Sequence, residues 1–182
     1  HQALAEAVGG ASGAAEAQDR AQVFAHAVVG GHGGQCERRG RHSGHAARRR
    51  RRVQLAVPFV RQHHDTCGPA TLVALSRFWN LPADHLEVAD QICYDGTPWD
   101  SARRWAEQSG CYVREFSLNW ADAVLLIDRG IPFALGIRHP GGSHMLAVVG
   151  YDSLKGSLLL RDPSRRYLSE FFNADRLEPN QP

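Results

Sequence analysis

The chain has 182 residues, of which 43% are hydrophobic, and a formal net charge of +2. This is typical of one globular domain with a sizeable core, and the near-balanced charge gives no general indication of nucleic-acid binding. No apolar run approaches the ~18 residues that a membrane helix needs, so we expect no membrane span. No secretion-signal pattern is visible, and we therefore expect a cytoplasmic location.

Residues 1–52 differ in composition from the remainder. They hold nine arginines and four acidic residues, a charge of +5, which leaves −3 for residues 53–182. The run Arg48–Arg52 is a block of like charges, and such blocks are usually solvated and disordered. We predict a disordered segment over residues 1–52, with at most a weak alanine-rich helix over residues 3–29. The alternative is a tether that contacts the phosphates of a nucleic acid or an anionic membrane.

The folded domain is predicted to cover residues 53–182. Residues 53–60 alternate as a short edge strand, and Pro58 falls within that run. A helix should follow from Cys67 to about Trp79, because apolar residues recur at helical spacing and Gly68-Pro69 suits a first turn. Cys67 then lies at a helix N-terminus, where free N–H groups and the helix dipole favour a thiolate. Asp65 is a candidate N-cap for this helix.

Three further helices and several strands are predicted after it. The helices cover residues 85–92 with Asp84 as N-cap, 99–109, and 120–129 with Asn119 as N-cap. The strands cover residues 111–116, 131–137, 145–151 and 158–160, and Phe171 and Phe172 belong to a possible terminal helix. Helices that precede most strands indicate an α+β fold.

The cysteines and histidines give no metal-binding spacing. None of Cys36, Cys67, Cys93 and Cys111 forms a C-x-x-C pair, so a zinc or redox motif is unsupported. The histidines of residues 32–45 lack a carboxylate or cysteine at a useful spacing. We expect no metal and no cofactor. Two disulfides remain possible, but a reactive Cys67 has to be free, which favours a reducing compartment.

Four residues are candidates for one catalytic site. His144 begins a predicted strand after a glycine-containing loop, and Asp162 follows the next strand. If these strands form a hairpin, the two side chains are neighbours, and the carboxylate orients the imidazole. An adjacent imidazole lowers the pKa of a thiol. The pattern predicts acyl transfer, with Cys67 as nucleophile, His144 as base, and Gln62 with a main-chain N–H as oxyanion donors.

The same residues lie in four stretches, residues 57–62, 66–70, 143–152 and 160–163, that resemble the C39-like peptidase domain of the papain-like cysteine peptidases. The resemblance covers roughly residues 53–175. It implies a papain-like fold, with an N-terminal helical lobe that carries the cysteine and a C-terminal antiparallel sheet that carries the histidine and the aspartate. It assigns Gln62, Cys67, His144 and Asp162 the roles given above. Soluble bacterial C39-like domains are more similar than the bacteriocin exporters, which typically have Asp where this chain has Thr66.

Other interpretations remain for these residues. A buried cysteine is often inert core, a lone histidine is often structural, and Asp-Pro is a common turn. We therefore keep two alternatives to a cysteine peptidase that acts on a peptide or protein substrate. One is a catalytically silent, peptide-binding C39-like module of a larger bacterial protein, and the other is a structural or tethering protein that acts through its arginine run.

Overall fold

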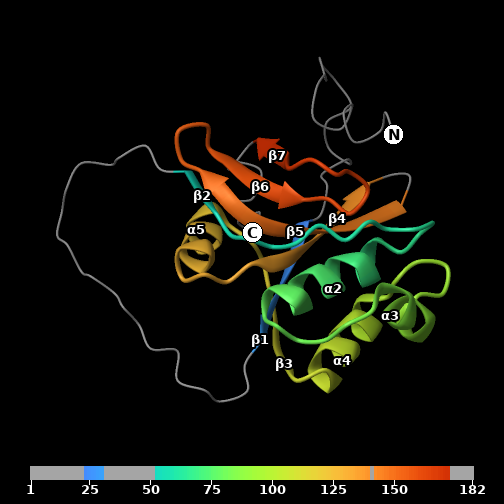
Figure 1. Ribbon diagram of the computed structural model, residues 1–182. Helices are drawn as coiled ribbons and strands as arrows, with labels where there is room; N and C mark the ends of the chain where they lie inside the picture. Colours follow the sequence, from blue (N-terminus) through green and yellow to red (C-terminus); the bar gives the residue numbers. More distant parts are fainter. Residues whose placement is uncertain (1–22, 31–51, 140–141, 173–182) are drawn as a thin grey trace, which may run out of the picture.

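The computed structural model describes residues 23–30, 52–139 and 142–172, which form an α+β fold (Figure 1). Its centre is a seven-stranded antiparallel sheet with the strand order β3-β1-β4-β5-β6-β7, and β2 pairs with β5. The strands are β1 (Val23–Gly30), β2 (Arg52–Gln54), β3 (Cys111–Phe116), β4 (Phe133–His139), β5 (Gly142–Asp152), β6 (Ser157–Arg161) and β7 (Ser169–Phe172).

Four helices lie in the described part of the chain, and their bounds agree with the predicted ones to within two residues. They are α2 (Cys67–Phe78), α3 (His85–Ile92), α4 (Trp99–Gln108) and α5 (Trp120–Asp128). The predicted caps of α3 and α5 are confirmed. Asp84 accepts hydrogen bonds from two main-chain N–H groups of α3, at 2.9 and 3.2 Å, and Asn119 accepts one from Asp122 at 2.8 Å. These local hydrogen bonds determine where each helix begins.

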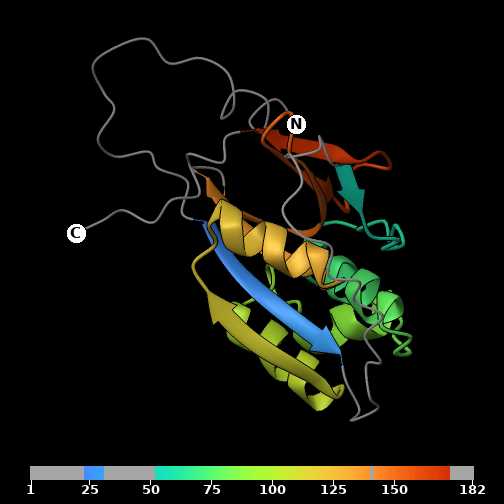
Figure 2. The same ribbon diagram turned by 90° about the vertical axis from the view of Figure 1, so that its left-hand side faces the viewer.

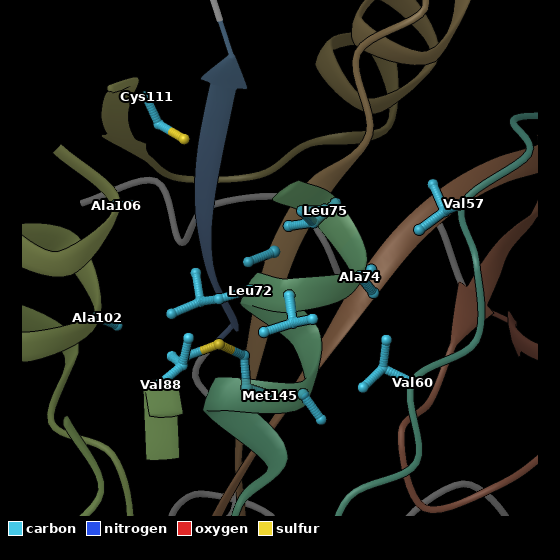
Figure 3. Packing of buried hydrophobic residues seen from close by; sticks show 14 of the residues in the cluster. Val57, Val60, Leu72, Ala74, Leu75, Val88, Ala102, Ala106, Cys111 and Met145 are labelled. Atoms are coloured by element: carbon cyan, nitrogen blue, oxygen red, sulfur yellow. The ribbon is translucent and has the colours of Figure 1, made fainter. Parts of the chain in front are cut away.

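Both faces of the central strand β5 are buried. Met145, Ala147 and Val149 belong to a core cluster with α2, α3 and α4 (Figure 3). Leu146 and Val148 belong to a second cluster, with α5. Figure 2 shows α5 and α4 on opposite sides of β1. Because helices cover the sheet on both sides, β5 has a continuous apolar run rather than an alternating one.

The N-terminal prediction is corrected in one part. Residues 23–30 form β1, which pairs with β3 on one side and β4 on the other. Disorder and the weak helix are therefore wrong for these residues, and the rest of 1–51 lies outside the described residues. Valine and phenylalanine favour strands, and two flanking strands give the main chain partners on both edges, which outweighs the helix preference of alanine.

Two other predicted elements differ. The predicted terminal helix is wrong at Phe171 and Phe172, which lie in β7 and pair with β6. Of the first strand predicted over residues 53–60, only Val53 and Gln54 pair with β5, and Arg52 before them also pairs with it. Arg52, the last residue of the arginine run, forms ion pairs with Asp152 at 3.3 Å and Glu170 at 2.9 Å. Its charge therefore joins β2 to β5 and to β7.

Candidate active site

Cys67 is the first residue of α2, as predicted. The N-cap residue is Thr66, whose side chain makes no capping hydrogen bond, and the first turn holds no acidic residue. Asp65 is not the cap, because its main chain is left-handed with φ +54°. The first-turn N–H groups of α2 are thus not taken by a side-chain cap, and they create a local positive potential at the half-buried thiol.

His144 lies on β5, and Asp162 lies directly after β6. The hairpin brings their side chains together, and His144 Nε2 donates to Asp162 Oδ1 at 2.9 Å. Only 12% of the histidine side chain and 5% of the aspartate side chain are exposed. The predicted proximity is confirmed, and the pair is shielded from the bulk water that would weaken it.

Asp162 is held in place by residues that follow it. Its Oδ1 atom accepts hydrogen bonds from the N–H of Ser164 at 2.9 Å and from the Ser164 hydroxyl at 2.7 Å. Burial by itself would raise the pKa of Asp162, but the hydrogen bond and charge of His144, together with Ser164, lower it below its ordinary value. Asp162 is therefore a fixed carboxylate that orients the imidazole.

The pKa values of Cys67 and His144 shift in opposite directions. Burial would raise the pKa of Cys67, but hydrogen bonds from His144 and from the N–H groups of Met145 and Gly68 lower it. Burial would lower the pKa of His144, but Asp162 and Cys67 raise it to about 9. Since Nε2 of His144 is bound to Asp162, Nδ1 is the ring nitrogen left for the thiol. The geometry therefore favours a thiolate–imidazolium pair, which titrates as a unit.

Gln62 reaches the same end of the sheet. Its main-chain N–H donates to the carbonyl of Pro163 at 3.0 Å, directly after Asp162. Its side-chain oxygen is buried and has no hydrogen-bond partner within the described residues. The segment before α2 is thus joined to the segment after β6, so that Gln62, Asp162 and His144 share one end of the fold.

Several contributors to the site carried little signal in the sequence. The N–H of Met145 acts through the main chain, which no residue type reveals. Ser164 had a detectable signal, because Asp followed two residues later by a hydrogen-bond donor is a common turn pattern. Thr71, four residues after Cys67, is a polar residue among apolar ones on α2. Its hydroxyl donates to the carbonyl of Met145 at 3.1 Å.

The histidines just before Cys67 and two tryptophans of the helical lobe lie in other environments. His64 is exposed and forms a 2.8 Å contact with Asp65, whereas His63 stacks on His85 with ring centroids 5.2 Å apart. Trp105 is buried, and Trp99 packs against the same core cluster. None of these side chains is part of the Cys67–His144–Asp162 group.

The thiols of Cys67, Cys93 and Cys111 are free, and Cys36 lies outside the described residues. Within residues 23–30, 52–139 and 142–172, no group of three or more His, Cys, Asp or Glu side chains is arranged to hold a metal ion. No helix in this part of the chain is both long and apolar enough to cross a membrane.

A thiol beside a buried imidazole–carboxylate pair, at the junction of a helical lobe and an antiparallel sheet, defines the papain-like class of fold and site. The family model of the Peptidase_C39 like family matches residues 54–174, and the chain belongs to this family. Membership indicates a peptidase-type function of the cysteine class. Searches of curated proteins and of solved structures returned no match.

Proposed function

We propose that the protein hydrolyses peptide or isopeptide bonds through a Cys67 acyl-enzyme. The observation that carries the proposal is the connected series Cys67–His144–Asp162. In it, one histidine contacts a buried carboxylate at 2.9 Å and lowers the pKa of the thiol. The geometry suits a nucleophile, its proton carrier and an orienting acid.

In the acylation step, the Cys67 thiolate attacks the substrate carbonyl carbon, and a C–S bond forms. The oxyanion that develops would accept hydrogen bonds from the Gln62 side-chain amide and the N–H of Cys67. The C–N bond then breaks as the His144 imidazolium transfers its proton to the leaving amine. A thioester, a neutral imidazole and a free amine result, so that charge and protons balance.

In the deacylation step, neutral His144 removes a proton from a water molecule that attacks the thioester. The C–S bond breaks and releases a carboxylic acid and the Cys67 thiolate, and the imidazolium is restored. Asp162 stays ionised throughout, since its lowered pKa keeps it charged at neutral pH. Its task is to hold the ring orientation and stabilise the imidazolium.

The proposed substrate is a peptide or protein, and the proposed location is the cytoplasm. Free thiols at Cys67, Cys93 and Cys111 support a reducing compartment. Similarity to the soluble C39-like domains remains a prediction. Peptide cleavage in cell extract by the purified protein, compared with Cys67→Ala, would identify the substrate class.

The first test is alkylation of Cys67 by iodoacetamide as a function of pH, read by peptide mass spectrometry. We expect the midpoint to lie well below the ~8.5 of a free thiol, and His144→Ala to move it toward that value. Cys93 in the same sample serves as an internal control. If Cys67 titrates like Cys93, the nucleophile assignment fails and the silent peptide-binding module becomes the better interpretation.

A further inference from the structure

Thr71 is buried on the same side of α2 as Cys67, one helical turn later. Its side-chain hydroxyl donates to the main-chain carbonyl of Met145 on β5 at 3.1 Å, between residues 74 positions apart in the sequence. The residue is 2% exposed. This hydrogen bond directly joins the helix that carries Cys67 to the strand that carries His144.

Both main-chain groups of Met145 are engaged by α2. Its carbonyl accepts from Thr71, and its N–H donates to the Cys67 sulfur. The opposite neighbour, β6, pairs with β5 only from Ala147 onward, so Met145 has no partner from that strand. The first two turns of α2 occupy the position that a strand would otherwise take. They supply hydrogen-bond partners for the main-chain groups of Met145 at this edge of β5.

Apolar packing alone does not determine the register of α2 on β5, that is, its position along the strand. The side chains of Leu72 and Met145 lie in one core cluster (Figure 3), and such contacts are non-directional, so a small slide of α2 costs little. A hydrogen bond weakens steeply when its length or angle changes. The Thr71–Met145 bond therefore limits sliding of α2 along β5, next to the histidine that precedes Met145.

We infer that Thr71 is a positioning residue, whose hydroxyl holds α2 in register with β5 and thereby sets the separation of Cys67 and His144. The inference rests on the proposed function, because it concerns the thiolate–imidazolium pair of the same site. Thr71 does not touch the reacting atoms. It acts through the main chain of Met145, whose carbonyl binds Thr71, whose N–H binds the Cys67 sulfur, and which directly follows His144.

Thr71→Val tests the inference, because it keeps the volume and branching of the side chain and removes the hydroxyl. Ser76→Ala is the matched control. It removes a buried hydroxyl from the same helix that has no hydrogen-bond partner among the described residues. Thr71→Ser restores a donor at the original position. Alkylation of Cys67 by iodoacetamide against pH is measured for all variants, well below the midpoint of thermal unfolding.

We expect the alkylation midpoint of Thr71→Val to rise by about one pH unit, as for the loss of one buried hydrogen bond. Thr71→Ser and Ser76→Ala should keep the wild-type midpoint. A merely structural role would lower the unfolding temperature without this shift. If Thr71→Val does not fold, Thr71→Ala is measured in the same way.

The outcomes separate the two proposals. A wild-type midpoint near that of Cys93 would overturn the proposed function itself. A low wild-type midpoint that Thr71→Val or Thr71→Ala leaves unchanged would overturn only the positioning role. An equal rise in Ser76→Ala would also overturn it, because any lost hydroxyl in α2 would then have the same effect.

Discussion

The half-buried Cys67 and the buried Cys111 show how different surroundings act on the same side chain. Cys67 begins α2, and its pKa is lowered despite its burial. Cys111 begins β3, is 6% exposed in the apolar core, and its pKa is raised by burial alone. Burial by itself makes a thiol less reactive, so the difference comes from the hydrogen-bond donors around Cys67.

The surroundings of Cys67 include three donors from two elements, β5 and α2. His144 comes from β5, Gly68 is the next residue in α2, and Met145 offers its main-chain N–H. The core cluster that holds Cys111 also includes Ala106 and Ala102 of α4 (Figure 3), whose side chains offer no polar atom. The comparison teaches that the N-terminus of a helix next to an imidazolium can lower the pKa of a thiol even where burial alone would raise it.

Removal of the thiol should have the largest effect. We expect Cys67→Ser to lower peptide hydrolysis by about a thousandfold or more, since a neutral hydroxyl cannot replace the thiolate. Initial rates on a cleaved peptide would measure the loss. Cys111→Ala is the control, with activity retained and about 1 kcal/mol lost from the free energy of unfolding. If Cys67→Ser and Cys111→Ala lost activity equally, the inferred difference between the two thiols would be contradicted.

Asp162→Asn should have the next largest effect. The amide cannot hold the imidazolium by charge, so the pKa of His144 should fall from about 9. Hydrolysis should then decrease by about 10²- to 10⁴-fold. NMR titration of the His144 ring would measure the pKa directly. An unchanged His144 titration would show that Asp162 does not stabilise the charged ring.

The pH dependence should distinguish alkylation from hydrolysis. The pKa of Cys67 is lowered, so the thiolate forms as pH rises through a value below that of a free thiol, and both reactions should share this acid limb. The pKa of His144 is raised to about 9, so the imidazolium is lost as pH rises through that value.

Above about pH 9, hydrolysis should therefore fall by about tenfold per pH unit, because no proton is available for the leaving amine. Alkylation needs only the thiolate and should stay at its plateau. Rates of both reactions measured from pH 4 to about pH 10 would test this. A common decline above pH 9 would instead indicate unfolding, which circular dichroism at the same pH values would reveal.

Gly68→Ala should have the smallest effect of these changes. A Cβ atom at residue 68 would lie 2.7 Å from Cβ and Oγ1 of Thr97. The first turn of α2 would have to shift, at a cost of about 1–3 kcal/mol in the free energy of unfolding, and the alkylation midpoint of Cys67 should rise. Chemical denaturation and alkylation would measure these changes.

The double variant Gly68→Ala/Thr97→Gly provides the control for this clash, because it removes the side chain that the new methyl group would meet. It should recover most of the lost stability once the effect of Thr97→Gly alone is subtracted. Without such recovery, the cost of Gly68→Ala would have another origin in the first turn.

Local sequence signals predicted most of the helical lobe. The caps Asp84 and Asn119 hydrogen-bond to residues two or three positions away, so their effect depends only on neighbouring residues. β1 was missed because its strand conformation depends on β3 and β4, which lie far along the chain. β7 was missed for a similar reason, since it needs the edge of β6.

The candidate site likewise has features that depend on nearby residues and features that depend on distant segments. The nearness of His144 and Asp162 followed from one hairpin, and its prediction required only two adjacent strands and their turn. The sequence by itself therefore determined the helix start at Cys67 and the histidine–aspartate pair, because both depend on short-range geometry. Only the tertiary structure decided that Thr71 and Met145 join α2 to β5, and that the N–H of Met145 reaches the Cys67 sulfur. Such contacts depend on the packing of distant segments, which no local pattern encodes.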